Sequence, residues 1–351
     1  MILRQSVAAG GREYTINFIG QKDFTNVNDT LRFISQNSDT EEITRLNLVS
    51  ELKKGLVRYV SKTPYSKYLK ISFVKKITHE KAIDNWNYWV FSVDTYFNFD
   101  GEESKKKINV NAGITADRIT DDLKMSFLMK LRYRSNKYEF EGKDPYTSIS
   151  KSKYFKSLIV KSLGNKFSAG IYASAISSTY ENKKLSLELA PAIEYNIYPY
   201  SDYNHTECRI LYKAVFNNVE YYAKTIYDKV NENLGYQSLS VNLEIKQRWG
   251  SIDTRLEGLN YFHDFSKNRL NFDSNFRFRV SEGLSLNFSG GFSMIHDQLN
   301  LPSEGATQEE ILLTRKEIAT QFEYSFSVGF RYTFGSIFSN IVNPRFGSRL
   351  H

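Results

Sequence analysis

One stretch near the end of the chain alternates between two kinds of residue. It runs from Gln321 to Phe334 with the sequence QFEYSFSVGFRYTF. Every second residue from Phe322 is apolar or aromatic, and the residues between them are Glu, Ser, Gly, Arg and Thr. Such alternation places the two kinds on opposite faces of a β-strand. The stretch also has the ~9–11 residues that a tilted strand needs to cross a bilayer, so it predicts the closing strand of an outer-membrane β-barrel.

The composition of the chain fits such a barrel. The 351 residues have a mean hydropathy of -0.46, and no apolar run approaches the ~18 residues of a membrane helix. Only alternate residues of a barrel strand face lipid, so a low mean hydropathy is expected. The net charge of +8 is spread along the chain, which favours acidic outer-membrane lipid such as lipopolysaccharide over nucleic acid as a neighbour. With one cysteine, Cys208, no intrachain disulfide is possible.

Alternation recurs between residues 82 and 334 and predicts about 12 strands, an even number as expected for a single-chain bacterial barrel. One strand, at 154–163, has no clear frame. The longest predicted connections are 141–153, 217–236 and 297–314, and short turns lie between them. Outer-membrane barrels have short periplasmic turns and long external loops, so we expect these connections outside. A soluble barrel or sandwich, the alternative fold, would not show this pattern.

Residues 1–81 predict a small periplasmic α/β domain before the barrel. Strands are expected at 13–19, 30–35 and 68–74, with a helix between a cap at Asp39 or Thr40 and the stop at Pro64. The start of the chain shows no signal peptide, although a barrel protein must be exported. We therefore expect that the sequence begins inside a longer precursor and that this domain lacks its first elements. The fold class is thus mainly β, a transmembrane antiparallel barrel that follows a partial α/β domain.

Charged side chains of both signs occupy the polar positions of the predicted strands and would face the lumen. The set expected there is Arg132, Arg134, Glu188, Glu194, Glu244, Arg248, Arg255, Asp273, Arg277, Arg279 and Arg331. Eight strands are filled by their own side chains and 16–18 leave an aqueous channel, so ~12 strands lie between these limits. Such charges would either cross-link into a plug or line a narrow pore.

Residues that would support catalysis are few. His263 and His296 lie at predicted strand ends near the outer rim. A membrane-embedded lipid hydrolase or acyltransferase needs an activated nucleophile and a base, and these histidines are the candidates for that alternative. No histidine pair has metal-ligand spacing and no acidic stretch has the pattern of a calcium loop. We expect no enzyme, no cofactor and no metal.

Six short motifs are spread over nearly the whole chain. They are GREYT at Gly11, KKGLVRYVSKTP at Lys53, NYWVF at Asn87, DGEES at Asp100, LPSEGATQEEILL at Leu301 and GSIFSNIVNPRFG at Gly335. These motifs resemble a group of uncharacterised outer-membrane β-barrel proteins of Bacteroidetes-type bacteria. The resemblance implies a signal peptide and a further β-α-β stretch before GREYT. It implies no catalytic residue, because no activity is attached to the group.

Together these features predict an outer-membrane β-barrel protein that is a structural anchor or a narrow solute pore. The α/β domain would bind a periplasmic protein partner, and the tail at 335–351 would also be periplasmic, since an even strand count places both termini on one side. The alternatives are the lipid hydrolase or acyltransferase, and a scaffold subunit of an envelope secretion or assembly machine.

Overall fold

The computed structural model describes residues 2–8, 11–36, 39–70, 84–139, 144–200, 206–247, 249–281, 283–305 and 317–335. The N-terminal part contains an antiparallel sheet of three strands, in the order β1-β2-β3, followed by an α-helix. Its elements are β1 (Ile2–Ala8), β2 (Gly11–Ile19), η1 (Lys22–Phe24), β3 (Asn28–Gln36), α1 (Glu41–Val60) and η2 (Pro64–Tyr68), where η denotes a short 3-10 helix. The strands expected at 13–19 and 30–35 are confirmed, as is the helix that follows them.

Helix α1 begins at the cap that the sequence suggests. The Thr40 hydroxyl accepts a hydrogen bond from the backbone N–H of Ile43 at 3.3 Å, and acidic residues occupy the first turn, where the helix dipole favours them. Gly55 is buried in the helix, and a Cβ there would lie 2.1 Å from the ring of Phe18 in β2. The glycine therefore allows the helix to pack closely on the sheet. Within the described residues, no helix is both long enough and apolar enough to span a membrane.

The strand expected at 68–74 is wrong at its beginning. Tyr68 is the last residue of η2, whose first turn contains Pro64 and whose start is capped by the Thr63 hydroxyl. Proline fits a helical first turn because its missing N–H has no partner there. Residues 71–83, which hold the rest of that strand and the predicted boundary at 81, lie outside the described residues, as do residues 336–351 of the expected tail.

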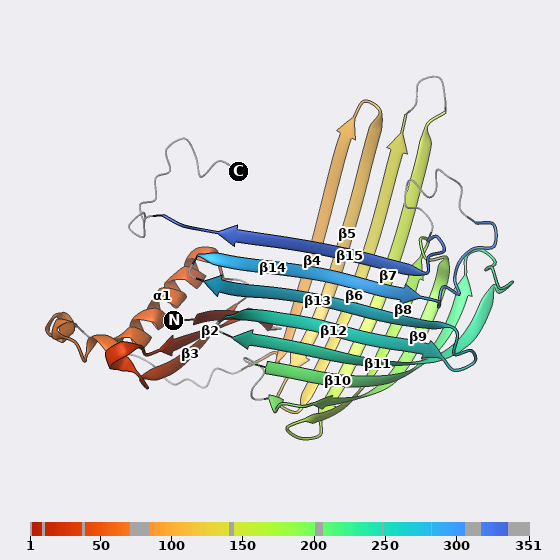
Figure 1. The fold of residues 1–351 in the computed structure, drawn as a ribbon. Coiled ribbons are helices and arrows are strands. Elements are labelled where there is room, and N and C mark those ends of the chain that lie inside the picture. The colour runs from red at the N-terminus through yellow and green to blue at the C-terminus, as the bar shows by residue number, and fades with distance from the viewer. Residues whose placement is uncertain are drawn as a thin grey trace. The chain divides into compact units, whose positions relative to one another are not determined.

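The rest of the chain forms a twelve-stranded antiparallel sheet in which consecutive strands lie side by side (Figure 1). The strands are β4 (Trp89–Glu102), β5 (Lys105–Ile119), β6 (Leu123–Tyr138), β7 (Tyr146–Ser162), β8 (Phe167–Ser178), β9 (Lys183–Asn196), β10 (Thr206–Tyr221), β11 (Asn231–Gln247), β12 (Gly250–Tyr261), β13 (Asn268–Ser281), β14 (Leu284–Ile295) and β15 (Phe322–Tyr332). Their order follows the sequence without a crossover, and β4 and β15 stand at its two ends. The predicted fold class, mainly β with twelve antiparallel strands after a small part with a helix, is confirmed.

The register of the strands separates a polar face of the sheet from an apolar one. Arg132 of β6 lies opposite Asn111 of β5 and Ser152 of β7, and we call the face that carries these three residues the polar face. This register also assigns the frame of β7, which the sequence left open. Leu158 and Val160 lie at polar-face positions in β7, so apolar residues occur on both of its faces and hide the alternation.

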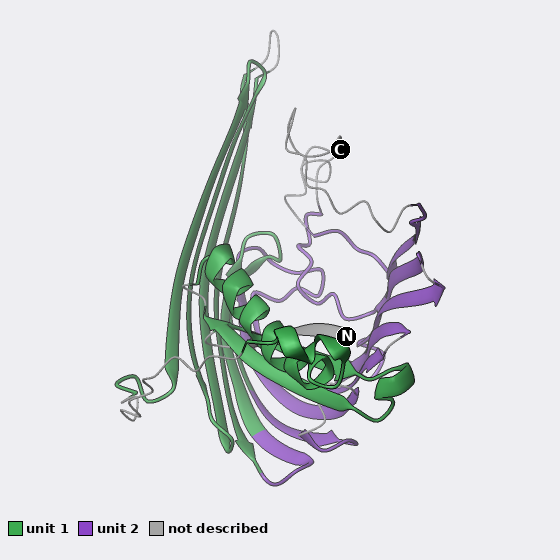
Figure 2. Cartoon of the chain, turned by 90° about the vertical axis from the view of Figure 1, so that its left-hand side faces the viewer, with its two compact units in different colours: residues 1–162, 170–189, 308–316 green, residues 163–169, 190–307, 317–351 purple. Residues whose placement is uncertain are grey.

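The chain divides into two compact units, coloured separately in Figure 2. Unit 1 comprises residues 1–162, 170–189 and 308–316, and unit 2 comprises residues 163–169, 190–307 and 317–351. In each unit the apolar face exposes large side chains, for example Phe97 and Phe99 in unit 1 and Leu239 and Phe326 in unit 2. The predicted alternation is therefore real in both units, and its apolar half is not covered by protein at these positions.

Two connections expected to be long are shorter than predicted. Residues 217–236 are largely strand, because β10 continues to Tyr221 and β11 begins at Asn231. Polar side chains pair across this extension, where Asn218 Nδ2 donates to Asn233 Oδ1 at 2.7 Å. Likewise, β7 begins at residue 146, inside the expected loop 141–153. In these places the strands remain paired beyond the last alternating apolar residue. The alternation in the sequence therefore underestimates the length of the strands. The connection between β14 and β15 is long as expected.

Candidate functional site

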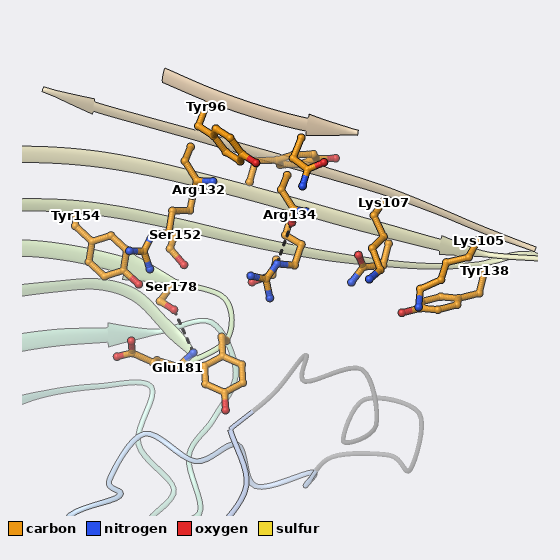
Figure 3. A pocket seen from close by; sticks show the side chains of 17 residues that line it. Tyr96, Lys105, Lys107, Arg132, Arg134, Tyr138, Ser152, Tyr154, Ser178 and Glu181 are labelled. Carbon is orange, nitrogen blue, oxygen red and sulfur yellow. Dashed lines mark hydrogen bonds between the residues drawn. The ribbon is translucent and has the colours of Figure 1, made fainter. Parts of the chain in front are cut away.

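The candidate site is a pocket on the polar face of unit 1, formed by β4–β7 together with the end of β8 and the turn after it (Figure 3). Its volume is about 620 Å³, within the ~300–1,000 Å³ of small-molecule sites. Four cations, Lys105, Lys107, Arg132 and Arg134, and one carboxylate, Glu181, contribute to its lining. Asparagine, serine and tyrosine side chains supply most of the remainder.

The two arginines of the pocket contact neutral groups. Arg134 Nε donates a hydrogen bond to Asn109 Oδ1 at 3.1 Å. The Arg132 guanidinium lies over the Tyr154 ring, 5.7 Å from the ring centroid (Figure 3). These contacts orient the guanidinium groups without neutralising them, because an amide oxygen and a phenol ring carry no net charge.

The same is true of the lysine at the edge of the pocket. The Lys105 ammonium lies 5.4 Å from the centroid of the Tyr138 ring. The carboxylate of the pocket, Glu181, is already paired with Lys183 at 2.7 Å. Among the described residues, no salt bridge involves any of the four cations that line the pocket. The pocket therefore has a surplus of positive charge.

Unit 2 presents a different arrangement around Glu194 of β9. Arg209 of β10 forms an ion pair with Glu207 and lies 3.9 Å from Glu194. The Tyr200 hydroxyl, in the connection after β9, donates to Glu194 at 3.1 Å. Burial raises the pKa of Tyr200 above its usual range. On the neighbouring strand, Glu244 forms an ion pair with the lysine two residues further on. Charges of opposite sign thus meet on this part of the polar face.

A second group of ion pairs surrounds Glu257 of β12. Its carboxylate lies 2.6 Å from the Arg255 guanidinium and 3.5 Å from Lys213 Nζ, and its side chain is 17% exposed. Asp273 of β13 lies opposite Arg255 in the register. A Cβ at Gly291 would lie 2.9 Å from Asp273 Oδ1, so the glycine leaves room for this carboxylate. This region contains both signs of charge in close contact.

The remaining residues of the expected set are divided between the units. In unit 1, Ser174 Oγ donates to Glu188 Oε2 at 3.1 Å. In unit 2, Arg277 Nε donates to an asparagine amide oxygen of β14 at 3.2 Å, and Arg279 and Arg331 occupy the same face. Arg248 lies outside the described residues. The lumen-facing location of the set stays a prediction, and the sequence did not indicate which of its members form pairs.

Several residues of these arrangements were absent from the expected set. Lys105 and Lys107 precede the apolar run of β5, and Lys213 and Arg209 lie in a strand predicted only in outline. Each of them occupies the same alternate set as the charged residues that were selected. Extending the predicted strand 107–117 by two residues would have found Lys105. The other three lie inside the predicted strands 107–117 and 209–216 and needed only the same alternation.

The polar face of unit 2 also carries an apolar cluster. Its members are Val219, Tyr221, Leu234 and Tyr261 of β10–β12, and Leu299 of the connection between β14 and β15, all at most 8% exposed. Backbone hydrogen bonds of 2.8 Å tie this connection to the one between β10 and β11. The alternation of residues in the strands did not predict this cluster. Leu299 belongs to a long connection, where no strand period applies.

The two candidate histidines have contacts that differ from a nucleophile–base pair. His263 lies edge-on to the Tyr261 ring at 5.6 Å between ring centroids, and His296 Nδ1 lies 3.2 Å from Asn268 Oδ1. Within the described part of the chain, no three histidine, cysteine or acidic residues form a group that would hold a metal ion. The hydrolase gains no support from these contacts and stays a hypothesis.

Comparisons with known proteins add two distant structural neighbours. No protein-family model and no curated protein sequence matches this chain. The β domain of the Bordetella autotransporter BrkA aligns with a TM-score of 0.28 and 12% identity, over 70% of this chain and 98% of that domain. The translocator domain of the autotransporter NalP from Neisseria meningitidis aligns with a TM-score of 0.30 and 10% identity, over 83% of this chain and 98% of that domain. Similarity at this level carries no argument about function.

Proposed function

We propose that the chain is an outer-membrane β-barrel protein. The observation that carries the proposal is the exposed apolar face, on which Phe97 is 59%, Leu239 50% and Phe326 74% exposed. Exposed large apolar side chains that follow strand after strand on one face are unusual for a soluble monomer, whereas lipid would cover them. Alternation of lipid-facing apolar residues with polar residues on the other face is the pattern of transmembrane barrels.

The proposal requires that the sheet closes. In the hydrocarbon of a bilayer each unpaired backbone N–H or C=O costs several kcal/mol, so the end strands β4 and β15 would pair with each other. The polar face would then line the lumen. An even number of strands would place both termini on one side, and short periplasmic turns would make that side the periplasm, where β1–β3 and α1 would bind a protein partner.

The role that the polar face supports best is a narrow pore for anionic solutes. Twelve strands enclose less space than the 16–18 of open porins, and the cations of the unit 1 pocket lack salt bridges among the described residues. Rings of lysine and arginine are typical of anion pores. The ion pairs and the apolar cluster of unit 2 favour a second candidate, a closed anchor for the periplasmic part.

Planar-bilayer recordings of the refolded full chain test the pore. We expect a steady conductance that favours anions, and a shift toward cations in the double variant Arg132→Glu/Arg134→Glu. Arg45→Glu, in α1, is the matched control and should leave the ion preference unchanged. Silent bilayers together with a stably co-purifying periplasmic protein would replace the pore with the anchor.

Protease shaving of intact cells tests the topology. Cleavage is expected first in the connections that the proposal places outside, at 222–230 and 297–305. The connection between β2 and β3, at 20–27, should be cut only after the outer membrane is opened. Cleavage in the opposite order would refute the periplasmic location of the N-terminal part.

A further inference from the structure

The two arginines of the unit 1 pocket form a regular pair of positive charges. Arg132 and Arg134 occupy successive polar-face positions of β6, so their backbones are about 6.8 Å apart along the strand. Both side chains belong to the lining of one cavity (Figure 3). A ligand that meets both would carry more than one negative charge or a delocalised acid group, since each guanidinium matches a planar two-oxygen anion.

Both guanidinium groups are held in place and retain donors for a ligand. Arg134 uses Nε for its 3.1 Å hydrogen bond to Asn109. A guanidinium has five N–H donors, so four remain for a ligand. Arg132 stacks on the Tyr154 ring at 5.7 Å and has no hydrogen bond to a carboxylate among the described residues. Orientation by neutral partners lowers the entropy lost when a ligand binds.

Two lysines extend the positive surface along β5. Lys105 and Lys107 lie opposite Glu102 and Asp100 of β4 in the register, but neither pair forms a salt bridge in the described structure. These carboxylates moderate the charge at one end of the pocket, so the arginines remain its most positive part. An anion would therefore bind with its acid groups at β6.

The neutral lining indicates what else the ligand contains. Asparagine amides project from three neighbouring strands, at Asn98, Asn111 and Asn136, beside Ser150 and the hydroxyl-bearing ring of Tyr96. Each amide supplies two donors and an acceptor, and each hydroxyl can do both. Such a wall satisfies a ligand with many hydroxyl groups, whereas a fatty acyl chain would find few apolar contacts.

We propose that this pocket is a binding site for an anionic oligosaccharide whose acid groups are carboxylates. The arginines of β6 bind the carboxylates, and the amides and hydroxyls of β4–β7 bind the sugar hydroxyls. The inference rests on the proposed function only in taking the polar face as the lumen, and it holds for a pore and for a closed anchor alike.

Isothermal titration calorimetry on the full chain, refolded in detergent, tests the site with trigalacturonate as the probe. We expect saturable binding, and at least tenfold weaker binding of the neutral trisaccharide maltotriose. Arg132→Gln/Arg134→Gln should weaken the binding of trigalacturonate by about tenfold or more, because two hydrogen bonds to a charged group are lost. Arg277→Gln/Arg279→Gln, on the polar face of unit 2, is the matched control and should bind as the unchanged chain does.

Three results would overturn the proposal. They are equal binding of maltotriose, equal binding of inorganic phosphate, and affinity that survives Arg132→Gln/Arg134→Gln. Circular dichroism confirms that each variant is folded, and Arg134→Lys, which keeps the charge, should bind more tightly than Arg134→Gln. Binding in detergent needs neither insertion nor conductance, so silent bilayers with intact binding would refute the pore alone.

Discussion

The polar faces of the two units use similar residues in different ways. On β5 and β6 of unit 1, arginine and lysine contact amide and aromatic groups, as in Arg134 with Asn109. On β10–β12 of unit 2, carboxylates lie beside the cations, as in Glu257 with Arg255 and Lys213. The strands β13–β15 resemble unit 1, since Arg277 also contacts an asparagine. Unit 2 adds the apolar cluster, which includes a residue from a long connection.

The comparison shows that the neighbours of each cation, along its own strand and on the strands beside it, decide whether its charge is paired. Both sets of strands carry cations at polar-face positions, but in unit 2 acidic partners lie two residues away on the same strand, as in Arg209 with Glu207 and Arg255 with Glu257. In unit 1 the strand opposite Arg132 and Arg134 supplies Asn111 and Asn109. Cations that contact carboxylates stabilise the polar face of unit 2, whereas cations that contact neutral groups in unit 1 keep their charge available to a ligand.

The largest expected difference between the polar faces lies in their apolar contacts. Leu234→Ala removes a side chain that is 7% exposed in the cluster of unit 2, and should lower the free energy of unfolding by about 2–4 kcal/mol. Leu128→Ala, at a half-buried polar-face position of unit 1, should cost clearly less. Urea unfolding in lipid vesicles, followed by tryptophan fluorescence, measures both. Equal losses would show that the cluster gives unit 2 no special packing.

The apolar faces, in contrast, should behave alike in the two units. Val328→Arg in unit 2 and Phe97→Arg in unit 1 would each place a charge in lipid, at a cost of about 2–4 kcal/mol near the midplane. Ser327→Arg and Asn98→Arg, one position away on the polar face, should cost much less. The same unfolding measurement applies, and equal costs at neighbouring positions would refute the assignment of faces.

Smaller effects are expected from the charges themselves. Glu257→Gln leaves Lys213 and Arg255 without their carboxylate, and should lower the free energy of unfolding by about 1–3 kcal/mol. Arg134→Gln should cost below ~1 kcal/mol, because its partner Asn109 is neutral and stays solvated. If Arg134→Gln lowered the free energy of unfolding as much as Glu257→Gln does, the charge of Arg134 would have to be paired with a carboxylate.

Much of the fold could be predicted from the sequence because a strand with one apolar face repeats a simple period. All twelve strands and the cap of α1 at Thr40 follow from such local rules. The rules fail where backbone pairing continues although the residues no longer alternate between apolar and polar. They miss the last residues of β10 and the first of β11, where polar residues such as Asn218 and Asn233 continue the ladder, and the polar-face leucine and valine of β7.

The candidate site could be predicted only as a list of residues that share a face. Alternation gives the side on which Arg132 and Arg255 lie, but not their contacts. The register sets Arg132 opposite Asn111 and Ser152, whereas Arg255 pairs with Glu257 of its own strand. Turns of unequal length set that register, so a slip of two residues would exchange a carboxylate for an amide without changing the face. Leu299 shows the other limit, since its contact with β10–β12 comes from a connection without periodicity.

The smallest effects concern carboxylates outside the strands, where the two units should not differ. Hydrogen bonds from Lys137 at 2.8 Å and Lys106 at 3.2 Å lower the pKa of Glu139 in unit 1, and a hydrogen bond from Lys224 lowers the pKa of Asp228 in unit 2. A carboxyl whose pKa falls on folding favours the folded chain above its unfolded pKa, and this contribution is lost as the pH falls through the folded pKa. Carboxyl NMR titrations should therefore give midpoints below the ordinary glutamate value for Glu139 and below the ordinary aspartate value for Asp228. Lys137→Met and Lys224→Met should each raise the midpoint of the partner carboxyl, and a midpoint that does not move would show that the pair is not formed in solution.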